Sequence, residues 1–157
     1  MAKREHIYEV TVAWTGDRGA GTADYRAYGR EHAIRAGTKS EIAGSADPAF
    51  RGDADRWNPE ELMLAAASAC HKLWYLHLAA EAGVVVSRYE DAAQGFVADA
   101  AAGGGFSRIV LRPKVTIRAG DDLGLAERLH HQAHAKCNIA NSVNFPILCE
   151  PTFLRAP

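Results

Sequence analysis

A long, nearly apolar segment in the middle of the chain constrains the fold most. Residues 58–82 begin with Asn-Pro-Glu-Glu and are followed by Gly83. Asn is a favoured N-cap, Pro is favoured at the first helical position, and Glu61 stands where a capping-box acid belongs. We therefore expect a helix from Pro59 to about Ala82 that stops at Gly83. Because this helix lacks a broad polar face, it should be buried on most of its sides.

The residues before this helix indicate strands and turns. Residues 7–15 alternate, which predicts a strand with one buried face. That face would consist of Tyr8, Val10, Val12 and Trp14. The glycine-rich stretch 16–21 should open a hairpin, and we expect one or two further strands within residues 22–43.

The residues after the helix indicate a second α/β stretch. Residues 84–99 and 106–118 are typical of two long strands, which a loop at 101–105 would join as a hairpin. A second helix should follow Asp121-Asp122, which can cap it, and a last strand should cover roughly residues 142–154. The second helix carries an inward stripe at every fourth residue, formed by Leu125, Leu129, Ala133 and Cys137.

This order of elements predicts an α+β fold, organised as a single domain over residues 1–157, with a mainly antiparallel sheet around the buried central helix. The chain is 48% hydrophobic and 24% charged, so it can bury a core without a disulfide or metal staple. Its net charge of −1 argues against nucleic-acid binding. No apolar run approaches the roughly 18 residues of a membrane span, and the N-terminus lacks an apolar signal segment. We expect a cytoplasmic protein with no membrane partner.

Three cysteines, Cys70, Cys137 and Cys149, are too few for a disulfide framework. Cys70 falls midway along the apolar helix, and Cys137 lies on the inward stripe of the second helix. Two interpretations remain open for this pair. Both residues are small core side chains, or they are a nucleophilic thiol and the resolving thiol that forms a disulfide with it. We interpret Cys149 as structural.

Charged residues near the central helix extend the second interpretation. Cys70 is not at a helix N-terminus, so a reactive thiolate there needs a cation. Arg18, Arg51 and Arg56 all lie in predicted loops, and each is either an exposed surface charge or that cation. Glu60 is ten residues from Cys70, which is roughly 15 Å along a helix and about 80° around it. The two side chains therefore cannot serve one site within one chain.

A group of histidines lies on the predicted second helix, together with Cys137: His130, His131 and His134. His130 and His134 have the i, i+4 spacing of helical metal sites, but no HExxH motif and no completing carboxylate is present. We expect a solvated helix face and no metal ion. The loop at 16–21 lacks the Lys-Ser/Thr of a phosphate-binding loop, so no nucleotide cofactor is expected.

Two blocks make the sequence resemble a known family. Asn-Pro-Glu-Glu-Leu at 58–62, then Ala-Ala-Ser-Ala-Cys at 66–70, with Cys137 following 67 positions after Cys70, resembles the OsmC/Ohr family. These are the osmotically inducible protein C and organic hydroperoxide resistance proteins. Residues 44–53 with Arg56-Trp57 look like an OsmC-like branch. The resemblance implies an OsmC-like fold and an intertwined homodimer with two sites at its interface.

The resemblance also implies a thiol-dependent peroxidase. The cysteine matching Cys70 attacks an organic hydroperoxide and becomes a sulfenic acid, and the one matching Cys137 condenses with it to a disulfide. A dithiol reductant, such as a protein-bound lipoyl group, restores both thiols. The arginine that stabilises the thiolate matches Arg18 in an Ohr-type comparison, and Arg51, after a one-residue shift, in an OsmC-type comparison. Glu60 of the other subunit would position that arginine. No metal or organic cofactor is implied.

The chain departs from the family pattern after each cysteine. His71 follows the first cysteine in place of an apolar residue, and Asn138 follows the second in place of the common Pro. The alternative function is therefore a non-catalytic redox-sensing module, or one that binds a small hydrophobic ligand, on the same fold. The presence of both cysteines favours the enzyme, whereas their flanking residues favour the alternative.

Overall fold

The computed structural model describes residues 5–98 and 103–157, and the chain divides into two compact units with their boundary after Leu62. We describe each unit by itself. The single domain over residues 1–157 stays a prediction. Residue 99 of the predicted strand 84–99 and residues 101 and 102 of the predicted hairpin loop lie outside the described residues. Across the described part, helices and strands mix in an α+β arrangement, as the sequence predicted.

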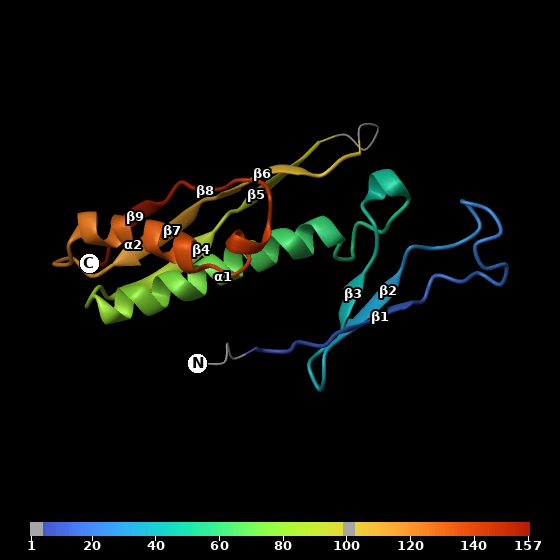
Figure 1. Ribbon diagram of the computed structural model, residues 1–157, viewed down its shortest axis with the longest axis horizontal. Coiled ribbons are helices and arrows are strands. Elements are labelled where there is room, and N and C mark those ends of the chain that lie inside the picture. The colour runs from blue at the N-terminus through green and yellow to red at the C-terminus, as the bar shows by residue number, and fades with distance from the viewer. Residues whose placement is uncertain (1–4, 99–102) are drawn as a thin grey trace. The chain divides into compact units, whose positions relative to one another are not determined.

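The first unit contains a three-stranded antiparallel sheet of order β1-β2-β3 (Figure 1). Its strands are β1 (Thr11–Trp14), β2 (His32–Arg35) and β3 (Ile42–Gly44). The predicted hairpin therefore forms between β1 and β2, with residues 15–31 as its connection. A short 3-10 helix, η1 (Pro48–Phe50), follows, and the chain then returns to β3 through a bridge between Gly44 and Trp57.

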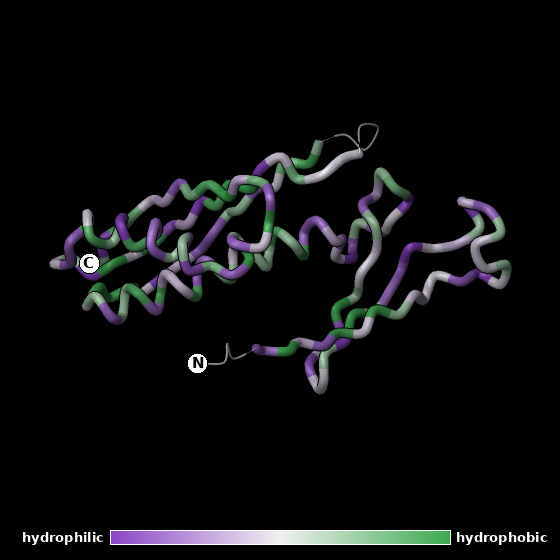
Figure 2. The backbone as a smooth tube through the Cα atoms, in the orientation of Figure 1, coloured by the Kyte–Doolittle hydropathy of each residue, from purple (hydrophilic) through white to green (hydrophobic). Residues whose placement is uncertain are grey.

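The predicted burial of the first strand is wrong for this chain taken by itself. Side chains of the expected inward face are exposed, with Tyr8 at 88% and Val12 at 61%. Hydrophobic residues recur along this segment in Figure 2, and their side chains are exposed. The physical reason is that residues 5–62 form a single sheet layer and contain no second layer on which to bury a face.

The second unit contains two three-stranded ladders, of order β4-β7-β9 and β5-β6-β8. The strands are β4 (Val86–Asp91), β5 (Gln94–Val97), β6 (Phe106–Leu111), β7 (Pro113–Ile117), β8 (Ile147–Cys149) and β9 (Thr152–Arg155). Each predicted long strand is thus interrupted once. Hydrogen bonds span the interruption: the Arg112 N–H donates to Asp91 Oδ1 at 2.7 Å, and the Glu150 N–H donates to the Leu111 carbonyl at 2.9 Å. Pro151 lacks the N–H that would continue the last strand.

These ladders are mixed rather than wholly antiparallel. β4–β7 and β5–β6 pair antiparallel, whereas β6–β8 and β7–β9 pair parallel. The cause is the helix that lies between β7 and β8 in the chain, because a connection that crosses over through a helix returns in the same direction. The prediction of a mainly antiparallel sheet is correct for the β4–β7 and β5–β6 pairs, whereas β8 and β9 add parallel pairs.

The central helix, α1 (Pro59–Glu81), begins with the predicted capping box. The Glu61 N–H donates to Asn58 Oδ1 at 2.8 Å, and the Asn58 N–H donates to Glu61 Oε2 at 3.2 Å. The helix is followed by Gly83, whose φ of 75° lies in the left-handed region that suits a helix end. Helix α2 (Leu123–Lys136) begins after Asp122, whose side chain accepts from the Leu125 N–H at 3.1 Å.

The core of the second unit lies where both helices meet β7 (Figure 1). Tyr75 of α1, Val115 of β7 and Ala133 of α2 are each fully buried there. The expectation that α1 is buried on most of its sides is wrong for the isolated chain, because Leu73 is 62% exposed. The sheet and α2 cover one face of the helix and leave another open. Within the described residues, no helix has both the length and the apolarity needed to span a bilayer.

Candidate active site

Cys70 and Cys137 interact within the second unit. Cys70 is half-buried midway along α1, and Cys137 is the C-cap residue of α2, with only 1% of its surface exposed. Burial raises the pKa of Cys137 to about 11, and the neighbouring Cys70 thiol adds to that rise. The two thiols, 67 positions apart in the chain, are therefore close enough to influence each other.

The loop after α2 donates backbone hydrogen bonds to both the sulfur and the carbonyl of Cys137. The Ala140 N–H donates to Cys137 Sγ at 3.4 Å, and the Asn141 N–H donates to the Cys137 carbonyl at 3.0 Å. The hydrogen bonds from Ala140 and Ile139 act against the rise in the pKa of Cys137, because they favour negative charge on sulfur. Asn138, which stands where the family commonly has Pro, is the first residue of this loop.

The second unit also contains a cluster that the sequence analysis missed. Nε2 of His71 lies 2.9 Å from Nδ1 of His130, and Sγ of Cys149 lies 3.7 Å from each of these two nitrogens. His71 is 1% exposed and His130 is 3% exposed, while Cys149 is half-buried. The ring of His130 also stacks on Tyr75, with a centroid separation of 3.9 Å.

Burial sets the protonation of this cluster. It lowers the pKa of His71 to about 4 and that of His130 to about 3, and it raises the pKa of Cys149 to about 12. At neutral pH both imidazoles are therefore neutral and Cys149 is a thiol. The predicted solvated face of α2 is correct for His131 and His134, which are exposed, and wrong for His130. His130 instead faces α1, together with the buried Ala126.

Two spacings in the sequence could have revealed the cluster. His71 lies four residues after Ala67 and four before Tyr75, and all three are buried on one face of α1. Cys149 lies two residues after the buried Ile147, so both point to the same face of β8. Neither spacing shows that the two faces meet, because that depends on tertiary packing.

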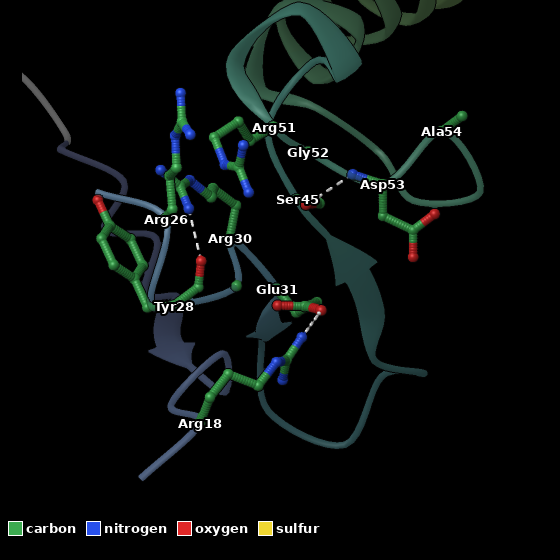
Figure 3. Close-up of a pocket in the computed structure, with 11 residues that line it drawn as sticks. Arg18, Arg26, Tyr28, Arg30, Glu31, Ser45, Arg51, Gly52, Asp53 and Ala54 are labelled. Carbon is green, nitrogen blue, oxygen red and sulfur yellow. Dashed lines mark hydrogen bonds and ion pairs between the residues drawn. The ribbon is translucent and has the colours of Figure 1, made fainter. Parts of the chain in front are cut away.

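The two candidate arginines lie in the first unit, where they line one cavity of about 500 Å³ (Figure 3). The guanidinium of Arg18 forms an ion pair with Glu31. The pKa of Glu31 is lowered by a hydrogen bond with its own backbone and then by Arg18. Arg51 caps η1 with φ at 63°, in the left-handed region that residues other than glycine seldom adopt. Arg56 lies 3.5 Å from Asp53 in an ion pair.

Arg26 and Arg30 also line this cavity, so four arginines face two acidic residues, Glu31 and Asp53. Arg30 donates to the backbone carbonyls of Tyr25 and Tyr28, the former at 2.7 Å. Its guanidinium also lies over both rings, 4.4 Å and 4.1 Å from their centroids. Figure 3 shows Arg26, Arg30 and Arg51 gathered at one end of the cavity and Arg18 with Glu31 at the other.

The predicted site residues thus form two groups, one in each unit. Cys70 and Cys137 come together in the second unit, and Arg18 and Arg51 come together in the first. Glu60 is exposed in the first turn of α1, where the neighbouring Glu61, and not Glu60, closes the capping box. The Glu60 side chain therefore takes no part in the capping box of α1.

Comparisons with known proteins agree on one family. A family model described as OsmC-like protein matches residues 52–151. An OsmC-like protein of unknown function from Vibrio cholerae has 30% sequence identity and a TM-score of 0.86, over 94% of this chain and 100% of that one. No functionally curated protein matches the chain.

More distant solved structures share the fold. An organic hydroperoxide resistance protein from Elizabethkingia anophelis has 18% identity and a TM-score of 0.68, over 98% of this chain and 100% of that one. Another, from Bacillus subtilis, has 22% identity and a TM-score of 0.63, over 94% of this chain and 98% of that one.

Proposed function

Because this chain belongs to the OsmC-like protein family, we propose that it is a thiol-dependent peroxidase that reduces organic hydroperoxides. The observation that carries the proposal is the interaction of half-buried Cys70 with buried Cys137. A pure binding module needs neither thiol, whereas a two-cysteine peroxidase needs both within reach of one another. Structures that share the fold include proteins named for organic hydroperoxide resistance.

The proposed reaction begins at Cys70. Its thiolate attacks one oxygen of the hydroperoxide, the O–O bond breaks, and the other oxygen leaves as an alcohol after taking up a proton. Cys70 becomes a sulfenic acid, so sulfur is oxidised and the peroxide is reduced by two electrons. The Cys137 thiol then condenses with this sulfenic acid, which forms a disulfide and releases water.

A dithiol closes the cycle by two thiol–disulfide exchanges, in which it becomes a disulfide and returns two electrons and two protons to the enzyme. The sum is ROOH plus a dithiol giving ROH, water and an oxidised dithiol. A reducing compartment such as the cytoplasm supplies dithiols of this kind, and a protein-bound lipoyl group is one candidate. No metal or organic cofactor takes part in these steps.

The environments of the two thiols support this division of roles. Cys70 is partly exposed, so a substrate can reach it. Burial raises the pKa of Cys137 to about 11, which keeps it a thiol at neutral pH and makes it a poor first nucleophile. Its backbone donors, including the Ala140 N–H, favour charge on sulfur when Cys137 loses its proton to the departing hydroxide.

We assign the thiolate-stabilising cation to Arg18, with Arg51 as the alternative, and its positioning to Glu60 of a second subunit. Arginine suits the role because it stays protonated and can bind a carboxylate with two hydrogen bonds. The test compares rates of peroxide reduction in Arg18→Ala, Arg51→Ala and Arg26→Ala, which all alter the same cavity. If only Arg18→Ala reduces peroxide more slowly than the wild type, the assignment is supported. If only Arg51→Ala does so, the role belongs to Arg51. If all three variants reduce peroxide at the same rate, the assignment is refuted.

We further propose that the protein is a homodimer. Each unit exposes apolar side chains that a monomer would leave in water, among them Val12 in the first unit and Leu73 in the second. Val12→Glu and Leu73→Glu should shift the mass in sedimentation equilibrium from dimer towards monomer, whereas the exposed loop variant Lys39→Glu should not. A monomeric wild-type protein at micromolar concentration would refute the dimer.

The decisive experiment measures consumption of cumene hydroperoxide and hydrogen peroxide with a dithiol present. We expect faster consumption of the organic peroxide, and none above background in Cys70→Ser, because serine provides no accessible anion near neutral pH. Cys149→Ser, which leaves the Cys70–Cys137 pair in place, should retain nearly full activity. Equal consumption by wild type and Cys70→Ser would exclude the enzyme and favour the ligand-binding or redox-sensing alternative.

A further inference from the structure

We propose that His71, His130 and Cys149 form a binding site for one zinc-type divalent metal ion, with two nitrogen ligands and one sulfur ligand. The three residues come from α1, α2 and β8, which are separate elements of the second unit. The comparisons assign no role to these three residues, and the proposed peroxidase reaction does not involve them. The site is therefore additional to the Cys70–Cys137 pair.

The separations of the ligand atoms fit tetrahedral zinc. With Zn–S near 2.3 Å and Zn–N of 2.0–2.1 Å, a tetrahedral angle places sulfur about 3.6 Å from each nitrogen and the nitrogens about 3.3 Å apart. Cys149 Sγ lies 3.7 Å from His71 Nε2 and 3.7 Å from His130 Nδ1. The two nitrogens are 2.9 Å apart, so the rings need to separate by only a few tenths of an ångström.

Burial makes the cluster costly when it has few polar partners. His71 is 1% exposed and His130 is 3% exposed, and one hydrogen bond joins their rings. A metal ion bonded to His130 Nδ1, His71 Nε2 and Cys149 Sγ would replace that hydrogen bond with three metal–ligand bonds. His130 Nε2, which has no hydrogen-bond partner among the described residues, is not one of these ligand atoms.

The set of donors selects the type of metal. Two imidazoles and one thiolate suit zinc and its borderline neighbours, whereas Mg²⁺ and Ca²⁺ prefer oxygen ligands. Zinc would displace the Cys149 proton, which passes to solvent, so the bound ligand is a thiolate.

An open coordination position accompanies the three protein ligands. His130 and Cys149 line a cavity of about 340 Å³, whose wall also includes Glu127, His131 and His134. This cavity has room for a water molecule as the fourth ligand and provides a route of entry for the ion. Three protein ligands with one open position are typical of zinc sites that bind an exchangeable ligand.

The test titrates Co²⁺ and then Zn²⁺ into tag-free protein that carries Cys70→Ser and Cys137→Ser, so that only Cys149 remains as a thiol. We expect saturation at one Co²⁺ per chain, with thiolate-to-cobalt charge-transfer absorption and tetrahedral d–d bands that Zn²⁺ removes. A titration without saturation near one equivalent would overturn the proposal. Because the readout is metal binding without Cys70 and Cys137, its failure is independent of any failure of the peroxidase proposal.

Variants in the same background identify the ligands. Cys149→Ser should abolish the charge-transfer band. His71→Asn and His130→Asn should each weaken Zn²⁺ binding by more than about 100-fold, since loss of an outer-shell partner alone costs roughly 10–100-fold. His6→Asn and His77→Asn, which alter exposed histidines outside this cavity, should leave binding unchanged. A band that survives Cys149→Ser, or binding lost only in the control variants, would refute the assignment.

A second measurement avoids the risk that a buried variant fails to fold. In the wild-type chain, Zn²⁺ should slow the alkylation of Cys149, measured by mass spectrometry of tryptic peptides, at least about tenfold, because a coordinated thiolate is no longer free to react. Alkylation of Cys149 at the same rate with and without equimolar Zn²⁺ would overturn the proposal, whatever the variants do.

Discussion

Nε2 of His71 lies 2.9 Å from Nδ1 of His130, which connects the residue after Cys70 on α1 to the buried face of α2. The two rings are parallel within 4°, and His130 in turn stacks on Tyr75. A polar side chain thus occupies a position in the helix–helix contact where an apolar one would be expected. His71, which departs from the family pattern, therefore contacts His130 of α2 in addition to following Cys70 in the chain.

We predict strong coupling between these two histidines. His71→Ala and His130→Ala should each lower the free energy of unfolding by about 2–4 kcal/mol, because each creates a cavity and leaves a buried polar ring without its partner. The double variant should cost less than the sum of the two by roughly 1 kcal/mol or more. Urea denaturation measures all three, with His131→Ala as the exposed control. Strict additivity would contradict the coupling.

The adjacent glutamates at the start of α1 should have separate roles. Glu61→Ala should lower the free energy of unfolding by about 0.5–1 kcal/mol through loss of the capping box, with little effect on peroxide reduction. Glu60→Ala should change stability by less than about 0.5 kcal/mol and should slow peroxide reduction. Thermal melts and peroxide assays on both variants check this. Loss of activity in Glu61→Ala alone would reverse the assignment.

Sharing of the site between subunits can be tested by mixing variants. Mixing slow Glu60→Ala subunits with inactive Cys70→Ser subunits should yield heterodimers with roughly half of the wild-type activity, because one of their two sites carries both lesions and the other carries neither. After random exchange about half of the dimers are heterodimers, so the mixture as a whole should gain roughly a quarter of the wild-type activity. Native mass spectrometry of subunits with different isotope labels confirms the exchange. Exchange without recovery would show that Glu60 does not serve the partner's Cys70.

Two substitutions at Arg51 separate its guanidinium from its backbone. Its φ of 63° is unfavourable for any side chain with a Cβ, so Arg51→Gly should be more stable than Arg51→Ala by about 1 kcal/mol. Both lack the charge, so they should have equal peroxidase activity. At the next position, Gly52→Ala should be destabilising, because a Cβ there would lie 1.6 Å from the Ala46 carbonyl oxygen. Chemical denaturation ranks the three variants, and a less stable Arg51→Gly would contradict the role of the backbone.

Acid should weaken the second unit through Asp121. The pKa of its carboxyl is lowered by the hydrogen bond from the Val85 N–H at 2.7 Å and by Arg118. A carboxyl whose folded-state pKa is depressed contributes stability above its unfolded pKa of 3.8, and this contribution disappears as pH falls below that value. Asp121→Asn should therefore flatten the fall in melting temperature between about pH 4 and pH 2. The control Asp122→Asn, which preserves the cap of α2, should retain the wild-type slope.

Oxidation should join Cys70 to Cys137 within one chain. One equivalent of cumene hydroperoxide should yield this disulfide as the main product in a non-reducing peptide digest, because Cys137 is the thiol that interacts with Cys70. In Cys137→Ser, the same treatment should leave Cys70 as a sulfenic acid that excess peroxide oxidises further. A dominant link to Cys149, or between chains, would contradict the pairing.

Local signals in the sequence were sufficient to predict the helices. The Asn58–Glu61 capping box, Gly83 after α1 and the Asp122 cap of α2 all depend on residues within one turn of a helix end, so they could be read directly. Alternation predicted the first strand, and the segments on either side of the 101–105 loop predicted the two long strands, although the interruption at Arg112 depends on Asp91, which is 21 residues away.

Burial and the meeting of distant side chains depended on tertiary structure. Apolar periodicity shows that one face of an element is apolar, but not which neighbour buries it. Val12 and Leu73 were therefore expected to be buried, and both are exposed in the single chain. His71 and His130 are 59 positions apart, and His71 and Cys149 are 78 apart. Their meeting requires α1, α2 and β8 to pack at one place. Sequence by itself determined which elements form, because caps and periodicity act over a few residues, whereas packing alone decided which side chains share a site.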